Sequence, residues 1–192
     1  MCNNTNFEKN QSENTCSDTE INDNGGFSVN KNGKNIHCLT IIGQIEGHYL
    51  LPPTDKTTKY EHVIPQLISV DEDDNIDGLL VILNTVGGDI EAGLAIAELI
   101  SGIKKPTASL VLGGGHSIGV PLAVSTNRSF IVPSATVVVH PVRMSGTILG
   151  TRQTYRQFQS IQDRIVNFIS AHCNCKPETI EKMMMKQMAY CF

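Results

Sequence analysis

The segment Gly113-Gly114-Gly115-His116-Ser117-Ile118-Gly119 joins two apolar stretches and places a serine at their junction. Residues 107–112 before it predict a buried strand, and residues 120–124 after it predict a short helix. Three consecutive glycines allow the sharp turn that such a junction needs. The free N–H groups at the start of the helix suit both a hydroxyl nucleophile and the oxyanion that it generates. Taken alone, the segment fits a glycine turn with a serine helix cap equally well.

A second glycine turn follows the preceding strand of the chain. Residues 78–84 form the clearest predicted strand, apolar on both faces as a central parallel strand should be. Gly87-Gly88 follows it, and then comes a helix that carries Leu94, Ala97, Ile100 and Ile103. The order strand, helix, strand, helix predicts an α/β fold with right-handed crossovers. Both glycine turns then lie at the carboxyl ends of parallel strands, where sites form in open α/β sheets.

A histidine ends a third predicted strand and can reach the same edge. This is His140, which directly follows residues 136–139. The Ser117 hydroxyl, the His140 imidazole and the N–H groups of Gly88 and Ile118 would together make a minimal acyl-transfer site. Each of these features is weak alone, but their matching topological positions favour a site over a set of structural residues.

Two other readings of the glycines are disfavoured. The turns match neither the dinucleotide-binding pattern G-x-G-x-x-G nor the P-loop, and no Lys-Ser/Thr follows them. Residues 115–119 also fit the G-x-S-x-G nucleophile elbow of α/β hydrolases, which orders its triad serine, acid, histidine. The last histidine is His172 and the nearest acid before it is Asp163. On one helix they would point to opposite sides, about 13.5 Å apart, so they could not share a hydrogen bond.

The remaining segments predict one domain behind a tail. Residues 1–35 are rich in Asn, Ser and Thr and predict a disordered tail, and residues 36–192 predict the folded domain. Further elements are expected as a strand at 39–43, a turn at 44–48, a helix from about His62 to Val70 with Pro65 in its first turn, a strand at 130–132, a long helix at 151–172 and a short one from Pro177 to Met185.

Composition excludes several classes of protein. The 192 residues carry a net charge of −4, which argues against nucleic acid or an anionic membrane as the main partner. We see no secretory signal and no apolar run of about 18 residues, so we expect no membrane insertion and a cytoplasmic location. The six cysteines are irregularly spaced, which indicates free thiols rather than a zinc site. We expect no metal and no cofactor.

Three short segments of the chain together resemble the proteolytic subunit of Clp protease. They are residues 84–89, 113–119 and 139–141. Within that family the chain looks most similar to the translocation-enhancing protein (TepA) branch, through further blocks at 51–53, 56–62 and 140–143. The resemblance covers about residues 39 to 187. It implies a ClpP/crotonase-like layered αβ spiral with a protruding handle helix at 151–172, whose broad apolar stripe would assemble a homo-oligomeric ring.

The resemblance also implies roles for the site residues. Ser117 would be the nucleophile, His140 the general base, and the Gly88 and Ile118 N–H groups the oxyanion hole of a serine-type endopeptidase. Its substrates would be polypeptides or peptides, and an AAA+ unfoldase is a candidate partner. Gly115-His116 replaces the family's small-residue pair, and no aspartate follows Asp163, although the family's triad aspartate comes after the final short helix. The domain is therefore expected to be C-terminally short. The alternative is a catalytically impaired relative that acts as a binding or assembly factor in preprotein export or sporulation.

Overall fold

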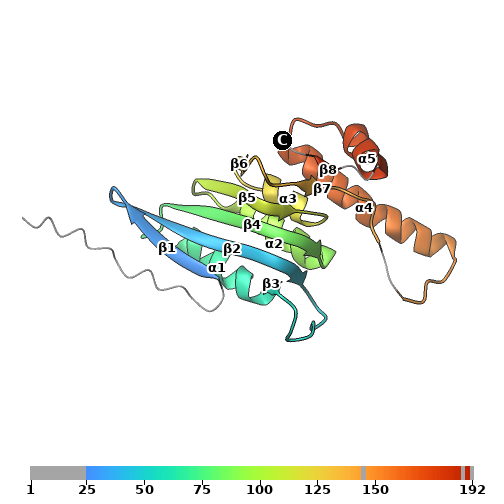
Figure 1. Cartoon of the computed structure of the whole chain (residues 1–192), viewed down its shortest axis with the longest axis horizontal. Helices are drawn as coiled ribbons and strands as arrows, with labels where there is room; N and C mark the ends of the chain where they lie inside the picture. The colour runs from blue at the N-terminus through green and yellow to red at the C-terminus, as the bar shows by residue number, and fades with distance from the viewer. Residues whose placement is uncertain (1–24, 144–145, 187–188, 191–192) are drawn as a thin grey trace, which may run out of the picture.

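The computed structural model describes residues 25–143, 146–186 and 189–190 (Figure 1). The elements follow one another in the order β1 (Gly26–Lys31), β2 (Lys34–Glu46), β3 (Thr57–Lys59), α1 (Tyr60–Glu72), β4 (Gly78–Gly88), α2 (Ile90–Gly102), β5 (Thr107–Gly115), α3 (Gly119–Val124), β6 (Arg128–Ile131), β7 (Val137–Val138), α4 (Arg152–His172), α5 (Pro177–Lys186) and β8 (Ala189–Tyr190). The predicted α/β class and the predicted order of helices and strands over residues 78–186 are confirmed, whereas β8 was not predicted.

A mixed sheet organises the domain. Its strands lie in the order β1-β2-β4-β5-β6, with β3 paired to the end of β2. The hairpin β1–β2 is antiparallel, whereas β2, β4, β5 and β6 run parallel to their neighbours. The strand predicted to be central, β4, has two parallel partners, and its Leu79, Val81 and Leu83 are almost fully buried. These alternate residues share one face of β4, and Leu80 and Ile82 on the other face are only half-buried, so the expected burial of both faces is not met.

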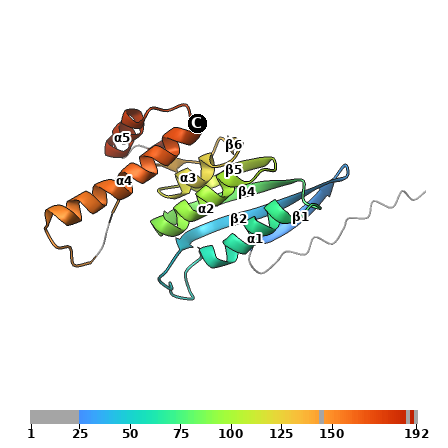
Figure 2. The ribbon, with the colours of Figure 1, turned by 180° about the vertical axis from the view of Figure 1, so that it is seen from behind.

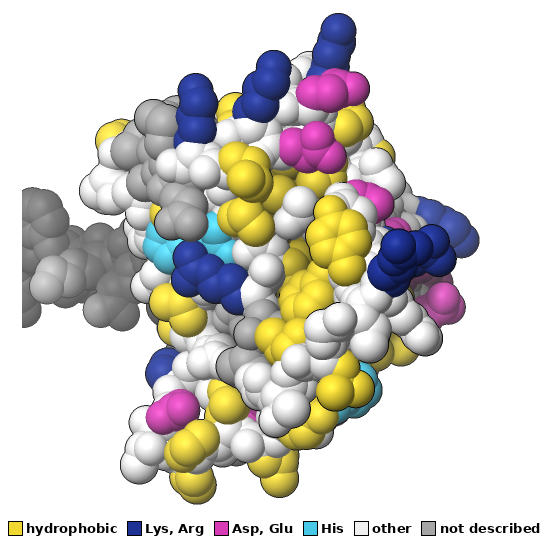
Figure 3. All heavy atoms as spheres, turned by 90° about the vertical axis from the view of Figure 1, so that its right-hand side faces the viewer, with side chains coloured by type: hydrophobic (Ala, Val, Ile, Leu, Met, Phe, Trp, Pro, Cys, Tyr) yellow, Lys and Arg dark blue, Asp and Glu magenta, His cyan; other side chains and the backbone are white. Residues whose placement is uncertain are grey.

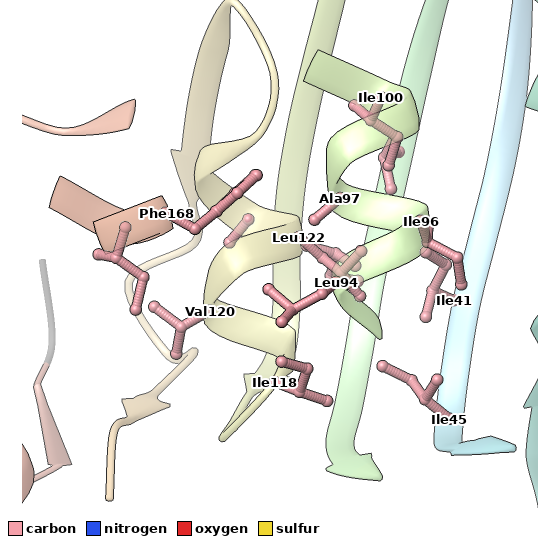
Figure 4. Packing of buried hydrophobic residues seen from close by; sticks show 14 of the residues in the cluster. Ile41, Ile45, Leu94, Ile96, Ala97, Ile100, Ile118, Val120, Leu122 and Phe168 are labelled. Atoms are coloured by element: carbon pink, nitrogen blue, oxygen red, sulfur yellow. The ribbon is translucent and has the colours of Figure 1, made fainter. Parts of the chain in front are cut away.

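Helices α1 and α2 cover one face of the sheet, and α3 and α4 continue the layer toward β5 and β7 (Figures 1 and 2). The core between them is aliphatic. In Figure 4, Ile41 of β2 lies beside Ile96 of α2, and Leu122 of α3 lies beside Leu94 of the same helix. Helix α2 starts at a capped position, because the Asp89 carboxylate accepts a hydrogen bond from the Ala92 N–H at 2.9 Å. This cap fixes the helix immediately after the glycine turn of β4.

The prediction of a disordered tail through residue 35 is wrong for its last ten residues. Gly26–Lys31 pairs with β2 in a hairpin whose turn is Asn32-Gly33, with φ values of 54° and 75°. Positive φ at both central positions is what a tight two-residue hairpin turn requires, and Asn-Gly adopts it readily. Residues 1–24 of the predicted tail lie outside the described residues.

Several predicted boundaries move because strand pairing extends past them. Residues 44–46, predicted as a turn, belong to β2 and pair with β3. The glycine turns are the last residues of β4 and β5, whose ladders run to Gly88 and Gly115. Helix α1 begins at Tyr60, so Pro65 lies in its second turn rather than its first. Within the ranges described above, no helix combines the length and the apolar character needed to cross a membrane.

Candidate active site

Ser117 occupies a strained turn between β5 and α3. Its φ is 56°, and among the described residues only Asn32 shares a positive φ without being glycine. Such a conformation costs an L-residue roughly 1–2 kcal/mol. Neighbouring backbone holds it, because the Ser117 N–H donates to the Val138 carbonyl at 2.8 Å and the His116 N–H donates to the Thr85 carbonyl at 3.1 Å. The serine is therefore fixed between β4 and the segment that leads to His140.

The first glycine turn lies directly against this serine. A Cβ added to Gly87 would lie 2.7 Å from the Ser117 Cβ, and the φ of Gly87 is 93°. At Gly88 a Cβ would collide with the backbone of Ile45. Thr85 organises the turn, since its hydroxyl donates to the Gly43 carbonyl at 2.6 Å and accepts from the Gly87 N–H at 3.0 Å. Both glycines are needed for the close packing of β4 on its neighbours.

The Ile118 N–H is available at the same turn. In the described part of the chain it makes no hydrogen bond, whereas the N–H groups of Gly119 and Val120 donate to the His116 and Ser117 carbonyls. The Ile118 side chain is buried, with 1% of its surface exposed, and it packs against Gly93 of α2. Burial of the side chain fixes the backbone while the N–H stays free for a ligand oxygen.

His140 follows β7, which runs beside the end of β5. The imidazole Nδ1 lies 2.7 Å from the Pro141 carbonyl oxygen. Because a carbonyl can only accept, the ring donates from Nδ1, which leaves Nε2 as an acceptor in the neutral imidazole. This is the tautomer that a general base needs. The backbone of Pro141 thus orients the ring.

A cavity of about 140 Å³ brings the four predicted residues together. Gly88, Ser117, Ile118 and His140 all line it, with Ile90, Val139, Val142, Arg143, Ile165 and Met184. Within the described residues Ser117 and His140 are not hydrogen-bonded to each other, as is common in sites without substrate. The described lining contains no Asp or Glu. The aspartate of the resembled family therefore has no counterpart among these wall residues.

An ion pair joins the two helices that carry the outer walls. Arg164 of α4 donates to both carboxylate oxygens of Glu91 of α2, at 2.7 and 2.9 Å. This bidentate contact lowers the pKa of Glu91 below its ordinary range. Arg164 directly precedes the lining residue Ile165, and Glu91 directly follows the lining residue Ile90. The pair therefore links the two segments that carry the lining residues Ile90 and Ile165.

Sequence reasoning missed the roles of Thr85 and Arg143. Thr85 carried a detectable signal, because a buried threonine at the end of an apolar central strand needs a hydrogen-bond partner for its hydroxyl. Arg143 carried none, since its place on the cavity wall depends on how the loop after His140 packs.

The expected absence of a metal site stays a prediction, although within the described residues no group of three or more His, Cys, Asp or Glu could hold a metal ion.

Comparison with known proteins gives consistent matches. The family model of Clp protease matches residues 33–190. The translocation-enhancing protein TepA of Halalkalibacterium halodurans is 54% identical over 153 residues, which are 80% of this chain and 60% of that protein. An ATP-dependent Clp protease proteolytic subunit of Lactococcus lactis subsp. lactis is 32% identical over 127 residues, 62% of this chain and 63% of the relative. The corresponding subunit of Streptococcus uberis is 36% identical over 94 residues, 48% of this chain and 47% of the relative. The chain thus spans less than two thirds of these relatives.

Proposed function

Because the chain belongs to the Clp protease family, we propose that it hydrolyses peptide bonds with Ser117 as nucleophile and His140 as general base. The observation that carries the proposal is that Ser117, His140, Gly88 and Ile118 line one cavity, although they come from three separate segments. The substrates are unfolded polypeptides or short peptides.

The proposed reaction proceeds through an acyl-enzyme. His140 Nε2 takes the hydroxyl proton as Ser117 Oγ attacks the scissile carbonyl carbon, and the Gly88 and Ile118 N–H groups donate to the resulting oxyanion. The tetrahedral intermediate collapses, the C–N bond breaks, and His140 gives its proton to the leaving amine. A water molecule, deprotonated by His140, then attacks the ester carbon and releases the carboxylic acid product and free Ser117.

The surroundings of His140 set an expectation for the rate. The Pro141 carbonyl fixes the tautomer, but it is neutral and stabilises an imidazolium less than a carboxylate does. We therefore expect slow turnover from the residues described here. A carboxylate supplied from elsewhere, near Nδ1, would displace the Pro141 carbonyl as its partner and raise the rate.

One relative favours a second candidate function. The protein that is 54% identical carries the name translocation-enhancing protein. Together with the acid-free cavity wall, this name supports a catalytically impaired relative that serves as a binding or assembly factor in protein export. The two candidates differ in one observable, because only the peptidase needs Ser117 for its action.

We also propose a homo-oligomeric ring with an AAA+ unfoldase as partner. The names of two relatives describe a proteolytic subunit of an ATP-dependent protease. Large apolar side chains are exposed before and at the start of α4, with 70% of Leu149 and 71% of Tyr155 accessible. Figure 3 shows the end of the molecule where exposed hydrophobic side chains lie among basic and acidic ones. A second subunit would cover such a surface. Light scattering that finds only monomer at micromolar concentration would exclude the ring.

Hydrolysis of fluorogenic peptides tests the peptidase. We expect slow release of fluorophore by the wild-type chain, no release by Ser117→Ala, and a rate lowered by two or more orders of magnitude in His140→Ala, since general-base catalysis contributes roughly 10²–10⁴-fold. Ser101→Ala is the matched control, because Ser101 lies exposed on α2 and should not change the rate. Equal hydrolysis by Ser117→Ala and wild type would contradict the proposal. A folded wild-type chain without any hydrolysis would favour the binding factor.

A further inference from the structure

The cavity that holds Ser117 has a single charged side chain in its described lining, that of Arg143. The other side chains of the wall, apart from Ser117 and His140, are aliphatic or those of glycine and methionine. At about 140 Å³ the space is smaller than the 300 Å³ or so of the smallest drug-sized pockets, so it fits one substrate side chain or chain end. A ligand in this space would therefore contact mainly apolar side chains and one cationic side chain, that of Arg143.

Arg143 has no ion-pair partner among the described residues. The acid that follows Ile90 of the lining, Glu91, is already engaged by Arg164 through two hydrogen bonds. Arg143 is exposed, so its guanidinium keeps its donors available at the rim of the cavity. An arginine with unused donors beside an apolar wall is suited to a carboxylate, which accepts two parallel hydrogen bonds from it.

The segment that carries Arg143 is tied to the site at two points. The Val138 carbonyl accepts from the Ser117 N–H at 2.8 Å, and the Val142 N–H donates to the Gln162 side chain of α4 at 3.4 Å. The backbone that leads to Arg143 therefore keeps a defined position relative to the nucleophile. A carboxylate bound to it would place a substrate bond near Ser117 only if that carboxylate lies close to the scissile bond.

We propose that Arg143 selects substrates that carry a carboxylate within one or two residues of the scissile bond. The inference rests on the proposed function, because it names the substrate class of the same site. The carboxylate can be an acidic side chain or the C-terminus of a short peptide, and both present the same two acceptor oxygens to the guanidinium. Arg143 acts here as a specificity residue and takes no part in proton transfer.

Matched peptide pairs test the selection. Quenched peptides that differ only by Glu or Gln beside the cleaved bond form one arm, and short peptides ending in a free carboxylate or in an amide form the other. We expect kcat/KM to favour the carboxylate member by about tenfold in at least one arm, which identifies the source, because hydrogen bonds to charged groups contribute more than neutral ones. Arg143→Gln should abolish the preference, Arg143→Lys should keep part of it, and 1 M salt should weaken it. Arg152→Gln, at the start of α4 and outside the cavity lining, should leave it unchanged.

A binding measurement separates this inference from the peptidase proposal. Ser117→Ala with labelled Glu and Gln peptides, followed by fluorescence anisotropy, reports recognition without chemistry. Tighter binding of the Glu peptide that disappears in the Ser117→Ala, Arg143→Gln double variant supports the inference even if wild type hydrolyses nothing. Hydrolysis or binding of both members of each pair to the same extent overturns the inference, and it leaves the peptidase proposal standing wherever hydrolysis is seen.

Discussion

Replacing Gly87 with alanine should both slow the reaction of Ser117 and destabilise the fold. The new Cβ would lie 2.7 Å from the Ser117 Cβ and 2.9 Å from the His116 carbonyl oxygen. Carbon atoms in contact prefer separations near 3.5–4.0 Å, so relief of the clash moves Ser117 by about 1 Å. A displacement of that size costs roughly 100-fold in rate when it affects a reacting group. We expect the reaction of Ser117 with a fluorophosphonate to slow by about that factor.

The loss of stability in Gly87→Ala has two causes, backbone strain at a positive φ and overpacking against Ser117. Alanine variants of two other glycines separate these causes. The backbone φ of 93° costs an alanine roughly 1–2 kcal/mol, and overpacking adds about 1–3 kcal/mol. Gly33 also has a positive φ, 75°, but a Cβ there would meet nothing within 4 Å. Gly33→Ala should therefore suffer only the backbone strain and label at the wild-type rate. Gly102, at the end of α2, also meets nothing within 4 Å and has no positive φ, so Gly102→Ala should lose neither stability nor labelling.

Urea unfolding and labelling kinetics on these three variants test whether the packing of Gly87 on Ser117 limits both stability and reactivity. The expected order of unfolding free energy is Gly102→Ala at or above wild type, then Gly33→Ala, then Gly87→Ala. Labelling of Gly87→Ala at the wild-type rate, or stability no lower than that of Gly33→Ala, would contradict the expected clash with Ser117. In either case the packing of the glycine turn on Ser117 would not determine its reactivity.

Three further predictions concern the fold. Leu122→Ala should lower the free energy of unfolding by about 2–5 kcal/mol in urea titrations, because it empties a fully buried position between α3 and α2, and a loss below 1 kcal/mol would contradict that packing. Burial lowers the pKa of His37 below its ordinary value near 6.5, so the folded state disfavours its charged form. The stability that comes from neutral His37 is present above pH 6.5 and is lost as pH falls below it, so His37→Gln should flatten the change in urea midpoint between pH 7.5 and 5.5, and an unchanged slope would contradict this. A double-mutant cycle of Glu91→Gln and Arg164→Gln should give a coupling of about 0.2–1 kcal/mol that falls in 1 M salt, because the pair is exposed, and zero coupling at low salt would mean that the pair does not fix α4 on α2.

Much of the fold could be predicted from local patterns. The continuous apolar runs of β4 and β5 indicate buried strands, the apolar stripe of α4 has the helical period, and the structure forms the expected element at each. The average composition of residues 1–35 predicts disorder and hides the hairpin, whereas Asn32-Gly33 between Val29 and Ile36 is a local hairpin signal. The glycines of β4 and β5 were predicted as turns because strand interiors rarely contain them, but pairing with adjacent strands overrides that preference.

Some features of the candidate site could also be predicted from the sequence, and others could not. Topology alone predicts that the ends of β4, β5 and β7 meet, and the structure brings Gly88, Ser117, Ile118 and His140 onto one cavity. Their catalytic roles stay predictions. The orientation of His140 by Pro141 and the presence of Arg143 on the wall depend on the path of a loop without periodicity. The roles of such loop residues can be assigned only when the packing of distant segments is known.

The most direct test of the proposed peptidase is whether Ser117 forms a covalent adduct. The full chain is incubated with a fluorophosphonate at neutral pH, and the adduct is localised by tandem mass spectrometry on the tryptic fragment that spans residues 105–128. We expect one adduct, on Ser117, with none in Ser117→Ala and slower formation in His140→Ala. A chain that circular dichroism shows to be folded, but that stays unlabelled or is labelled on another residue, would contradict this expectation.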